Sequence, residues 1–188
     1  MKKELLFSAA LLISCLIRMA PAQVIASTDI IPPVSEETNL ITYEKAVDAT
    51  ELKKGDLFEK AIAWINDYYK NPTDVIREKN ADAGKIVCKA RFKIFNEPDK
   101  NGTVTDAGVV QYTLTLLFKD AKYKYQFSEF NWKQLSYYPV ERWMNSDSPS
   151  YSKSFPYYLR QVDEYAKKTI AELEKFMMAK KKSKKDDW

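Results

Sequence analysis

The chain has 188 residues, of which 45% are hydrophobic and 13% aromatic, and its formal net charge is +4. This length allows one domain with a substantial core, and the aromatic content excludes a disordered chain. The sequence contains no histidine, which removes the commonest general base and the commonest zinc ligand. No enzyme activity, cofactor or metal site is therefore expected.

The first 22 residues have the features of a signal peptide. Lys2 and Lys3 precede an apolar run over residues 5–17, and Ala20-Pro21-Ala22 is a small-x-small cleavage site. The run is too short for a transmembrane helix, which needs roughly 20 residues. We therefore predict cleavage after Ala22 and export to the periplasm or the extracellular space.

Cys15 allows a second interpretation of the same segment. It ends the sequence Leu-Ile-Ser-Cys, a loose lipobox in which this cysteine would be lipidated and retained as the first residue. Cys88 is the only other cysteine, so either interpretation leaves no Cys-x-x-Cys pair for redox chemistry or zinc.

The charge after removal of residues 1–22 is nearly balanced. That segment holds three basic residues and one acidic residue, so 27 basic and 25 acidic residues remain. Five of the lysines lie in the last ten residues, either at a frayed helix end or in contact with anionic lipid. The body of the chain lacks the strong basic surface of nucleic-acid-binding proteins, so no nucleic acid is expected as a partner.

The first half of the chain predicts a linker, a strand and a helix. Residues 23–39 contain two prolines and no periodicity, which is typical of a flexible linker. Residues 40–47 are rich in strand-forming types. Apolar residues at three and four spacing over 54–70 predict an amphipathic helix that ends before Asn71-Pro72. Residues 74–79 are a short strand candidate.

Three strands with alternating apolar and polar residues follow. The alternation covers 85–94, 110–118 and 122–127, which is typical of antiparallel strands with one buried face. Cys88 falls on the buried face. The alternation slips at 128–130, which indicates a bulge or the end of the strand.

The last part of the chain predicts an aromatic loop over 135–153 and a second helix over 154–182, with Ser154 as a candidate N-cap. Residues 183–188 form a tail. The element order β-α-β-β-β-β-α predicts a single α+β domain over 40–182, with an antiparallel sheet of about five strands and two helices on one face.

Four segments resemble a known family: ITYEK at 41–45, DLFEKAIAWIND at 56–67, AGKIVCKA at 83–90 and YTLTLLFKDAKYKYQFSEF at 112–130. They are similar to the exported bacterial proteins of domain-of-unknown-function family 4468, which has a TBP-like fold. The resemblance implies a curved antiparallel sheet with helices on one face. It implies no activity and no functional residues, and a fold does not carry a function by itself.

Basic residues on the polar face of the predicted sheet are one candidate site for an anionic partner: Lys85, Lys89, Arg91, Lys93 and Lys124. The alternative is a solvated face on which these side chains are balanced by cross-strand acids such as Glu78.

The aromatic loop is the second candidate site. Its residues Tyr137, Tyr138, Arg142, Trp143, Met144 and Tyr151 have the composition of an interaction hot spot. The alternative is that the loop closes the open end of the core.

These patterns favour a non-catalytic binding or interaction module of the bacterial cell envelope, with an envelope protein or a glycan as its partner. The alternative is a carrier of a small amphipathic ligand held between the second helix and the sheet. An enclosed apolar cavity would favour the carrier, and a solid core would favour the interaction module.

Overall fold

The computed structural model describes residues 30–134 and 136–179. The signal peptide with its lipobox alternative, most of the predicted linker and the tail at 183–188 lie outside these residues. None of the helices in the described ranges is long and apolar enough to cross a membrane.

An antiparallel sheet of six strands forms one layer, in the order β1-β5-β4-β3-β2 with β6 added to β5. The strands are β1 Tyr43–Asp48, β2 Ile76–Asn80, β3 Lys85–Phe95, β4 Asp106–Lys119, β5 Lys122–Lys133 and β6 Tyr137–Pro139. The predicted α+β class with an antiparallel sheet is confirmed. β6 is an additional strand that the sequence pattern did not predict.

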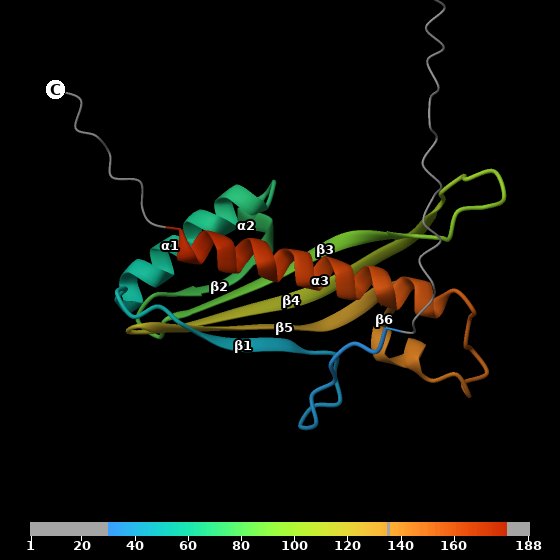
Figure 1. Cartoon of the computed structure of the whole chain (residues 1–188), viewed down its shortest axis with the longest axis horizontal. Helices are drawn as coiled ribbons and strands as arrows, with labels where there is room; N and C mark the ends of the chain where they lie inside the picture. The colour runs from blue at the N-terminus through green and yellow to red at the C-terminus, as the bar shows by residue number, and fades with distance from the viewer. Residues whose placement is uncertain (1–29, 135, 180–188) are drawn as a thin grey trace, which may run out of the picture.

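Two helices, α1 Lys54–Tyr68 and α3 Phe155–Met178, cover the same face of this sheet (Figure 1). The first turn of α1 is capped from a distant part of the chain, because the Asp120 carboxylate accepts a hydrogen bond from the Lys54 N–H at 2.7 Å. Ser154 occupies the N-cap position of α3, but its side chain makes no capping hydrogen bond. The predicted N-cap position of Ser154 is therefore confirmed, but without the side-chain hydrogen bond that such a cap usually makes.

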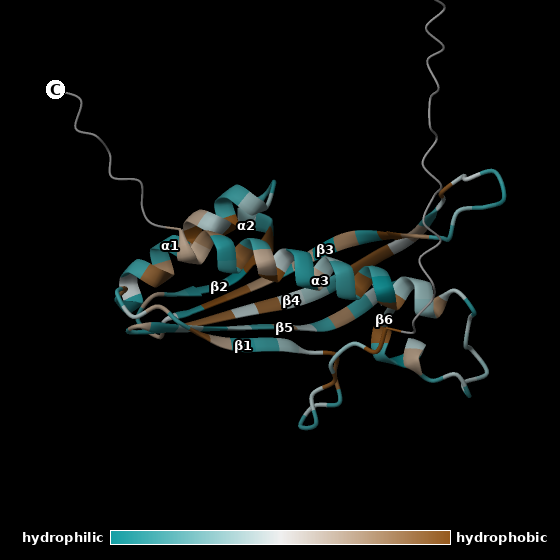
Figure 2. Cartoon of the chain, viewed as in Figure 1, coloured by the Kyte–Doolittle hydropathy of each residue, from teal (hydrophilic) through white to brown (hydrophobic). Residues whose placement is uncertain are grey.

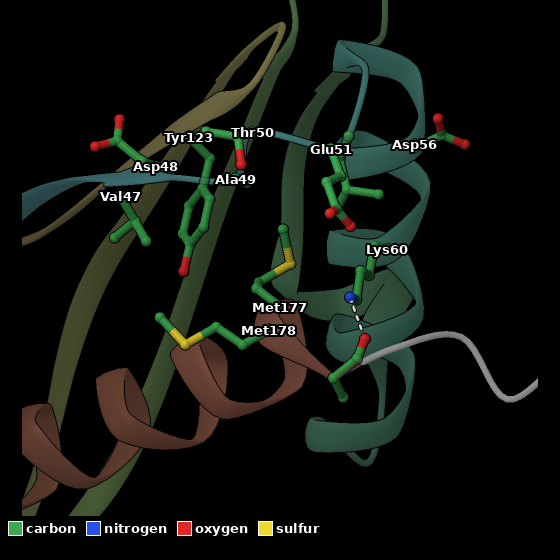
Figure 3. Close-up of a pocket in the computed structure, with 12 residues that line it drawn as sticks. Val47, Asp48, Ala49, Thr50, Glu51, Asp56, Lys60, Tyr123, Met177 and Met178 are labelled. Atoms are coloured by element: carbon green, nitrogen blue, oxygen red, sulfur yellow. Dashed lines mark hydrogen bonds between the residues drawn. The ribbon is translucent and has the colours of Figure 1, made fainter.

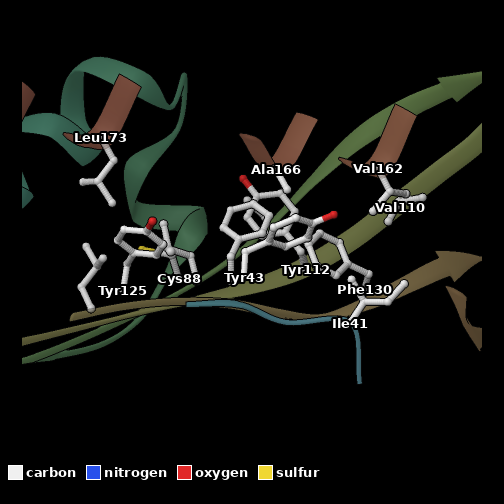
Figure 4. Packing of buried hydrophobic residues seen from close by; sticks show 14 of the residues in the cluster. Ile41, Tyr43, Cys88, Val110, Tyr112, Tyr125, Phe130, Val162, Ala166 and Leu173 are labelled. Carbon is white, nitrogen blue, oxygen red and sulfur yellow. The ribbon is translucent and has the colours of Figure 1, made fainter. Parts of the chain in front are cut away.

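The core lies between α3 and the sheet, and it is filled by side chains from both layers (Figure 4). Tyr112 of β4 stacks on Phe127 of β5 with ring centroids 4.4 Å apart, beneath Val162 and Ala166 of α3. The strands carry bands of hydrophobic and hydrophilic residues (Figure 2). Cys88 is fully buried, as its place in the alternation predicted.

The predicted slip at 128–130 is a β-bulge in β5. The register with β4 shifts between Gln111 and Thr113, and Glu129 has a φ of 56°. β5 then continues to Lys133, so the slip does not end the strand.

Two predictions were wrong in detail. Residues 72–75 form one helical turn, α2 Pro72–Val75, and the strand predicted from Asp74 begins only at Ile76. Proline at the start of α2 favours this turn, because its fixed φ is helical. The predicted loop at 135–153 contains β6 and a 3₁₀ helix, η1 Val140–Met144.

Candidate functional site

The edge of β3 that faces away from β4 is only partly covered. β2 pairs with β3 from Lys85 to Cys88, and the chain preceding Ile76 leaves the sheet as α2. No other strand in the described ranges pairs with this edge of β3. On the opposite side of the sheet, β1 and then β6 cover β5 in succession. The edge beyond Cys88 has no equivalent of β6.

A side chain of α3 closes the far end of this edge. The Phe95 N–H donates to Gln161 Oε1 at 2.9 Å, and Gln161 Nε2 donates to the Phe95 carbonyl, also at 2.9 Å. A primary amide presents the same donor and acceptor as a peptide group. Gln161 therefore occupies the place of a neighbouring strand at Phe95.

The backbone groups between these two ends point outward. The Gly84 carbonyl accepts from the Phe118 N–H, and the Asn96 N–H donates to the segment before β4, so even-numbered residues of β3 bond toward β4. Because backbone groups alternate along a strand, the N–H and C=O of Arg91 and Lys93 face away from β4. These N–H and C=O groups of Arg91 and Lys93 make no hydrogen bond to a described side chain or loop.

A surface hollow of about 790 Å³ lies along this edge, which we call the edge hollow. The end of α1, the α2 turn, β3 and Tyr165 of α3 line it. Four basic side chains, Lys70, Arg77, Lys89 and Arg91, surround it with one acid, Asp74.

The positive charge of the edge hollow is only partly neutralised. Among the described residues, Lys89 approaches Glu129 at 3.6 Å, whereas Lys70, Arg77 and Arg91 have no ion pair. An anion could therefore bind to these three cations in the hollow without breaking an existing ion pair.

Tyrosines form the wall of the edge hollow on the helix side. The Tyr69 and Tyr112 hydroxyl oxygens are 3.0 Å apart, and Tyr165 stacks on Phe92 with centroids 3.9 Å apart. Burial raises the pKa of Tyr69, and desolvation raises the pKa of Tyr68 to about 12. Both hydroxyls stay protonated at neutral pH, so this wall offers neutral hydrogen-bonding groups and apolar rings.

Residues 43–133 match the family model described as "Domain of unknown function (DUF4468) with TBP-like fold". This segment is a DUF4468 domain. The match confirms the resemblance found in the sequence, and it ends before the aromatic loop and α3.

Two solved structures have a fold similar to that of this chain. A DUF4468 family protein from Bacteroides ovatus is 14% identical, with a TM-score of 0.63 over 78% of this chain and 91% of that one. A TBP-like protein from Parabacteroides distasonis is 15% identical, with a TM-score of 0.58 over 77% of this chain and 96% of that one. No curated protein matches the chain. The comparisons thus establish the fold and the family of residues 43–133, and they indicate no catalytic family.

The basic residues predicted on the outer face of the DUF4468 sheet are mostly in cross-strand ion pairs. Only Arg91 has no acidic partner among the described residues. The partners are Glu78 for Lys85, Glu129 for Lys89, Asp106 for Lys93 and Glu44 for Lys124, at 2.8, 3.6, 2.8 and 2.9 Å. Most of the predicted basic residues therefore match the balanced alternative, and the one without an acidic partner, Arg91, lies at the edge hollow.

The aromatic loop mainly closes the core. Trp143 is only 1% exposed and stacks on Phe155 with centroids 5.5 Å apart, so the prediction that it is a contact residue is wrong. Tyr138 and Tyr151 are half-buried, and the Arg142 guanidinium lies 5.2 Å from the Tyr138 ring centroid. The large apolar surfaces of these aromatic side chains favour their burial against the core.

Three of the predicted contact residues of the loop remain exposed, Tyr137, Arg142 and Met144. The Tyr137 hydroxyl donates to Gln111 Oε1 at 3.4 Å, and Gln111 is the β4 partner of Arg91. The structure thus brings one residue of each predicted site to the same outer surface.

Sequence reasoning missed several residues of the edge hollow, Lys70, Tyr69, Arg77 and Tyr165, and it missed Gln161 at the end of the free edge. Their only signal was composition, because they come from different elements and the hollow depends on where β2 ends. The described residues also hold no group of three acids or cysteines placed to bind a metal ion.

A second hollow of about 570 Å³ lies where α3 ends beside α1 (Figure 3). Met177 and Met178 point into it, and Asp48, Glu51 and Asp56 lie around it. The buried Tyr123 hydroxyl at this end hollow has no hydrogen-bond partner among the described residues.

A substitution at Tyr123 tests whether its hydroxyl lacks a hydrogen-bond partner. We expect Tyr123→Phe not to lower the free energy of unfolding, because the hydroxyl makes no hydrogen bond to a described residue. Tyr43→Phe is the matched control, since the Tyr43 hydroxyl donates to the buried Asp163 carboxylate at 2.9 Å. It should cost about 1.5–3 kcal/mol in urea unfolding. Equal losses of stability in the two variants would show that the Tyr123 hydroxyl does make a stabilising hydrogen bond.

Proposed function

We propose that this protein is a non-catalytic binding module of the cell envelope that holds an anionic partner at the edge hollow. The observation that carries the proposal is the convergence of Lys70, Arg77 and Arg91, without ion pairs to other described residues, on one hollow beside an uncovered strand. Clefts lined by one sign of charge concentrate ligands of the opposite sign. The location in the envelope rests on the predicted signal peptide.

The alternative function, a carrier of an amphipathic ligand between α3 and the sheet, has less support. Tyr112, Phe127 and Phe130 are fully buried there and pack beneath α3, so side chains occupy the centre of that space. The end hollow, with its methionines, would offer apolar surface to such a ligand, but it lies beyond the packed space between α3 and the sheet.

The proposal predicts a local effect of charge removal on binding. We expect the triple variant Lys70→Gln, Arg77→Gln, Arg91→Gln to bind poly-L-glutamate about tenfold more weakly, because each exposed pair contributes up to about 1 kcal/mol. The salt dependence of binding should also become shallower, since fewer charges are screened. Isothermal titration calorimetry at two salt concentrations measures both effects.

The matched control removes the same number of charges elsewhere. Lys119, Lys168 and Lys175 are exposed and lie outside the edge hollow. The variant Lys119→Gln, Lys168→Gln, Lys175→Gln should bind poly-L-glutamate nearly as well as the unmodified protein. Equal weakening of the two triple variants would show that binding follows net charge alone, and would refute the proposed site.

A further inference from the structure

We propose that the free edge of β3 binds an acidic peptide as an additional antiparallel strand. The inference rests on the proposed function, because it takes the anionic character of the partner from the edge hollow. It adds that the partner is a polypeptide in extended conformation and that the main contact is a ladder of backbone hydrogen bonds, as in other cases of strand addition.

The two ends of the free edge define the length of the added strand. β2 covers β3 as far as Cys88, and Gln161 bonds to Phe95, which leaves room for about five residues opposite Lys89 to Lys93. At roughly 3.3 Å per residue, this corresponds to a segment of about 17 Å. Gln161 already shows that an amide pairs with both backbone groups of this edge.

The backbone of the free edge specifies a peptide among anionic ligands. The N–H and C=O groups of Arg91 and Lys93 both point away from β4 along the free edge, so the edge offers donors and acceptors in alternation. A peptide strand satisfies both kinds of group, whereas an anionic lipid or polysaccharide offers no regular row of donors and acceptors at this spacing. Antiparallel pairing agrees with every other pair in this sheet.

The side chains of β3 specify the sequence pattern of the peptide. Residues opposite one another in an antiparallel pair project to the same face, so residues opposite Lys89, Arg91 and Lys93 lie beside basic side chains. The residues between them lie opposite Ala90 and Phe92 and face the tyrosine wall. We therefore infer acidic residues at every second position, separated by apolar residues.

A second copy of this chain is a poor occupant of the same edge. Two β3 edges paired antiparallel around Arg91 would bring the cations of both copies together, and like charges opposite one another destabilise a pair. Charged residues on edge strands oppose such self-association in natural proteins. An acidic segment converts the same cations into attractive partners.

The experiment uses three fluorescently labelled peptides with the core sequence Glu-Val-Glu-Leu-Glu and the full-length protein. The first is unmodified, the second is N-methylated at the glutamate amides, and the third is N-methylated at the valine and leucine amides. In an antiparallel strand opposite Arg91, the glutamate amides bond to β3 and the other amides point away. We expect the second peptide to bind at least about tenfold more weakly and the third to bind nearly as well as the first.

Hydrogen exchange gives an independent measurement on the protein. The amides of Arg91 and Lys93 should exchange more slowly with the first peptide bound, while those of Phe92 and Ile94, already bonded toward β4, should change little. Equal binding by all three peptides would overturn strand addition, and the reverse order of the methylated peptides would overturn its antiparallel register. If all three peptides bound the unmodified protein equally and all three lost binding to the Lys70, Arg77, Arg91 triple variant, the charged site would be supported and strand addition would not. Binding indifferent to that variant would refute the proposed function itself.

Discussion

Replacing Trp143 by alanine is expected to lower the free energy of unfolding by about 3–5 kcal/mol, as large aromatic deletions in cores do. The indole is 1% exposed, and its neighbours Phe155 and Trp132 each lie 5.5 Å away between ring centroids. Truncation would leave a cavity between η1, β5 and the start of α3. Because domains are stable by only about 5–15 kcal/mol, the loss would shift a urea unfolding curve strongly.

Met144→Ala is the matched control for this prediction. Met144 follows Trp143 in η1 but is 38% exposed, so its truncation should change stability by about 0.5 kcal/mol or less. A Trp143→Ala protein as stable as the Met144→Ala protein would show that the indole does not belong to the core. The aromatic loop would then again be a candidate contact surface for a partner.

Long periodic segments made most of the fold predictable. The alternation over 85–94 and the three and four spacing over 54–70 each fix which face of an element is buried, and the structure has β3 and α1 there. The short elements α2, β6 and η1 were missed, because three to five residues are too few to show a period. Trp143 was left open for the same reason, since tertiary packing alone decides the burial of an aperiodic residue.

The candidate site was less predictable than the fold. Lys89 and Arg91 were placed on the polar face by their alternation, but the free edge beside them depends on β2 ending where α2 begins. Gln161 contacts Phe95 from 66 residues away, through a side-chain amide that no local pattern marks. A binding edge of this kind arises from the absence of a neighbouring strand, which sequence periodicity does not record.

Alkaline pH is expected to unfold the protein between about pH 10 and 12, because several tyrosines are buried as neutral groups. Desolvation raises the pKa of Tyr112, Tyr69, Tyr43 and Tyr123 above the ordinary value of 10, and that of Tyr68 to about 12. Above about pH 10 the unfolded chain releases these protons while the folded chain retains them. The folded state then binds more protons than the unfolded state, so stability is full below pH 10 and falls as the pH rises.

The Tyr123→Phe variant isolates one of these contributions. It removes a buried ionisable group without removing a protein hydrogen bond, so we expect the pH midpoint of alkaline unfolding to rise, measured by far-ultraviolet circular dichroism. Tyr137→Phe is the matched control, because Tyr137 is 58% exposed, and it should leave the midpoint unchanged. A midpoint that moved equally in both variants, or in neither, would contradict the view that buried tyrosines set the alkaline limit.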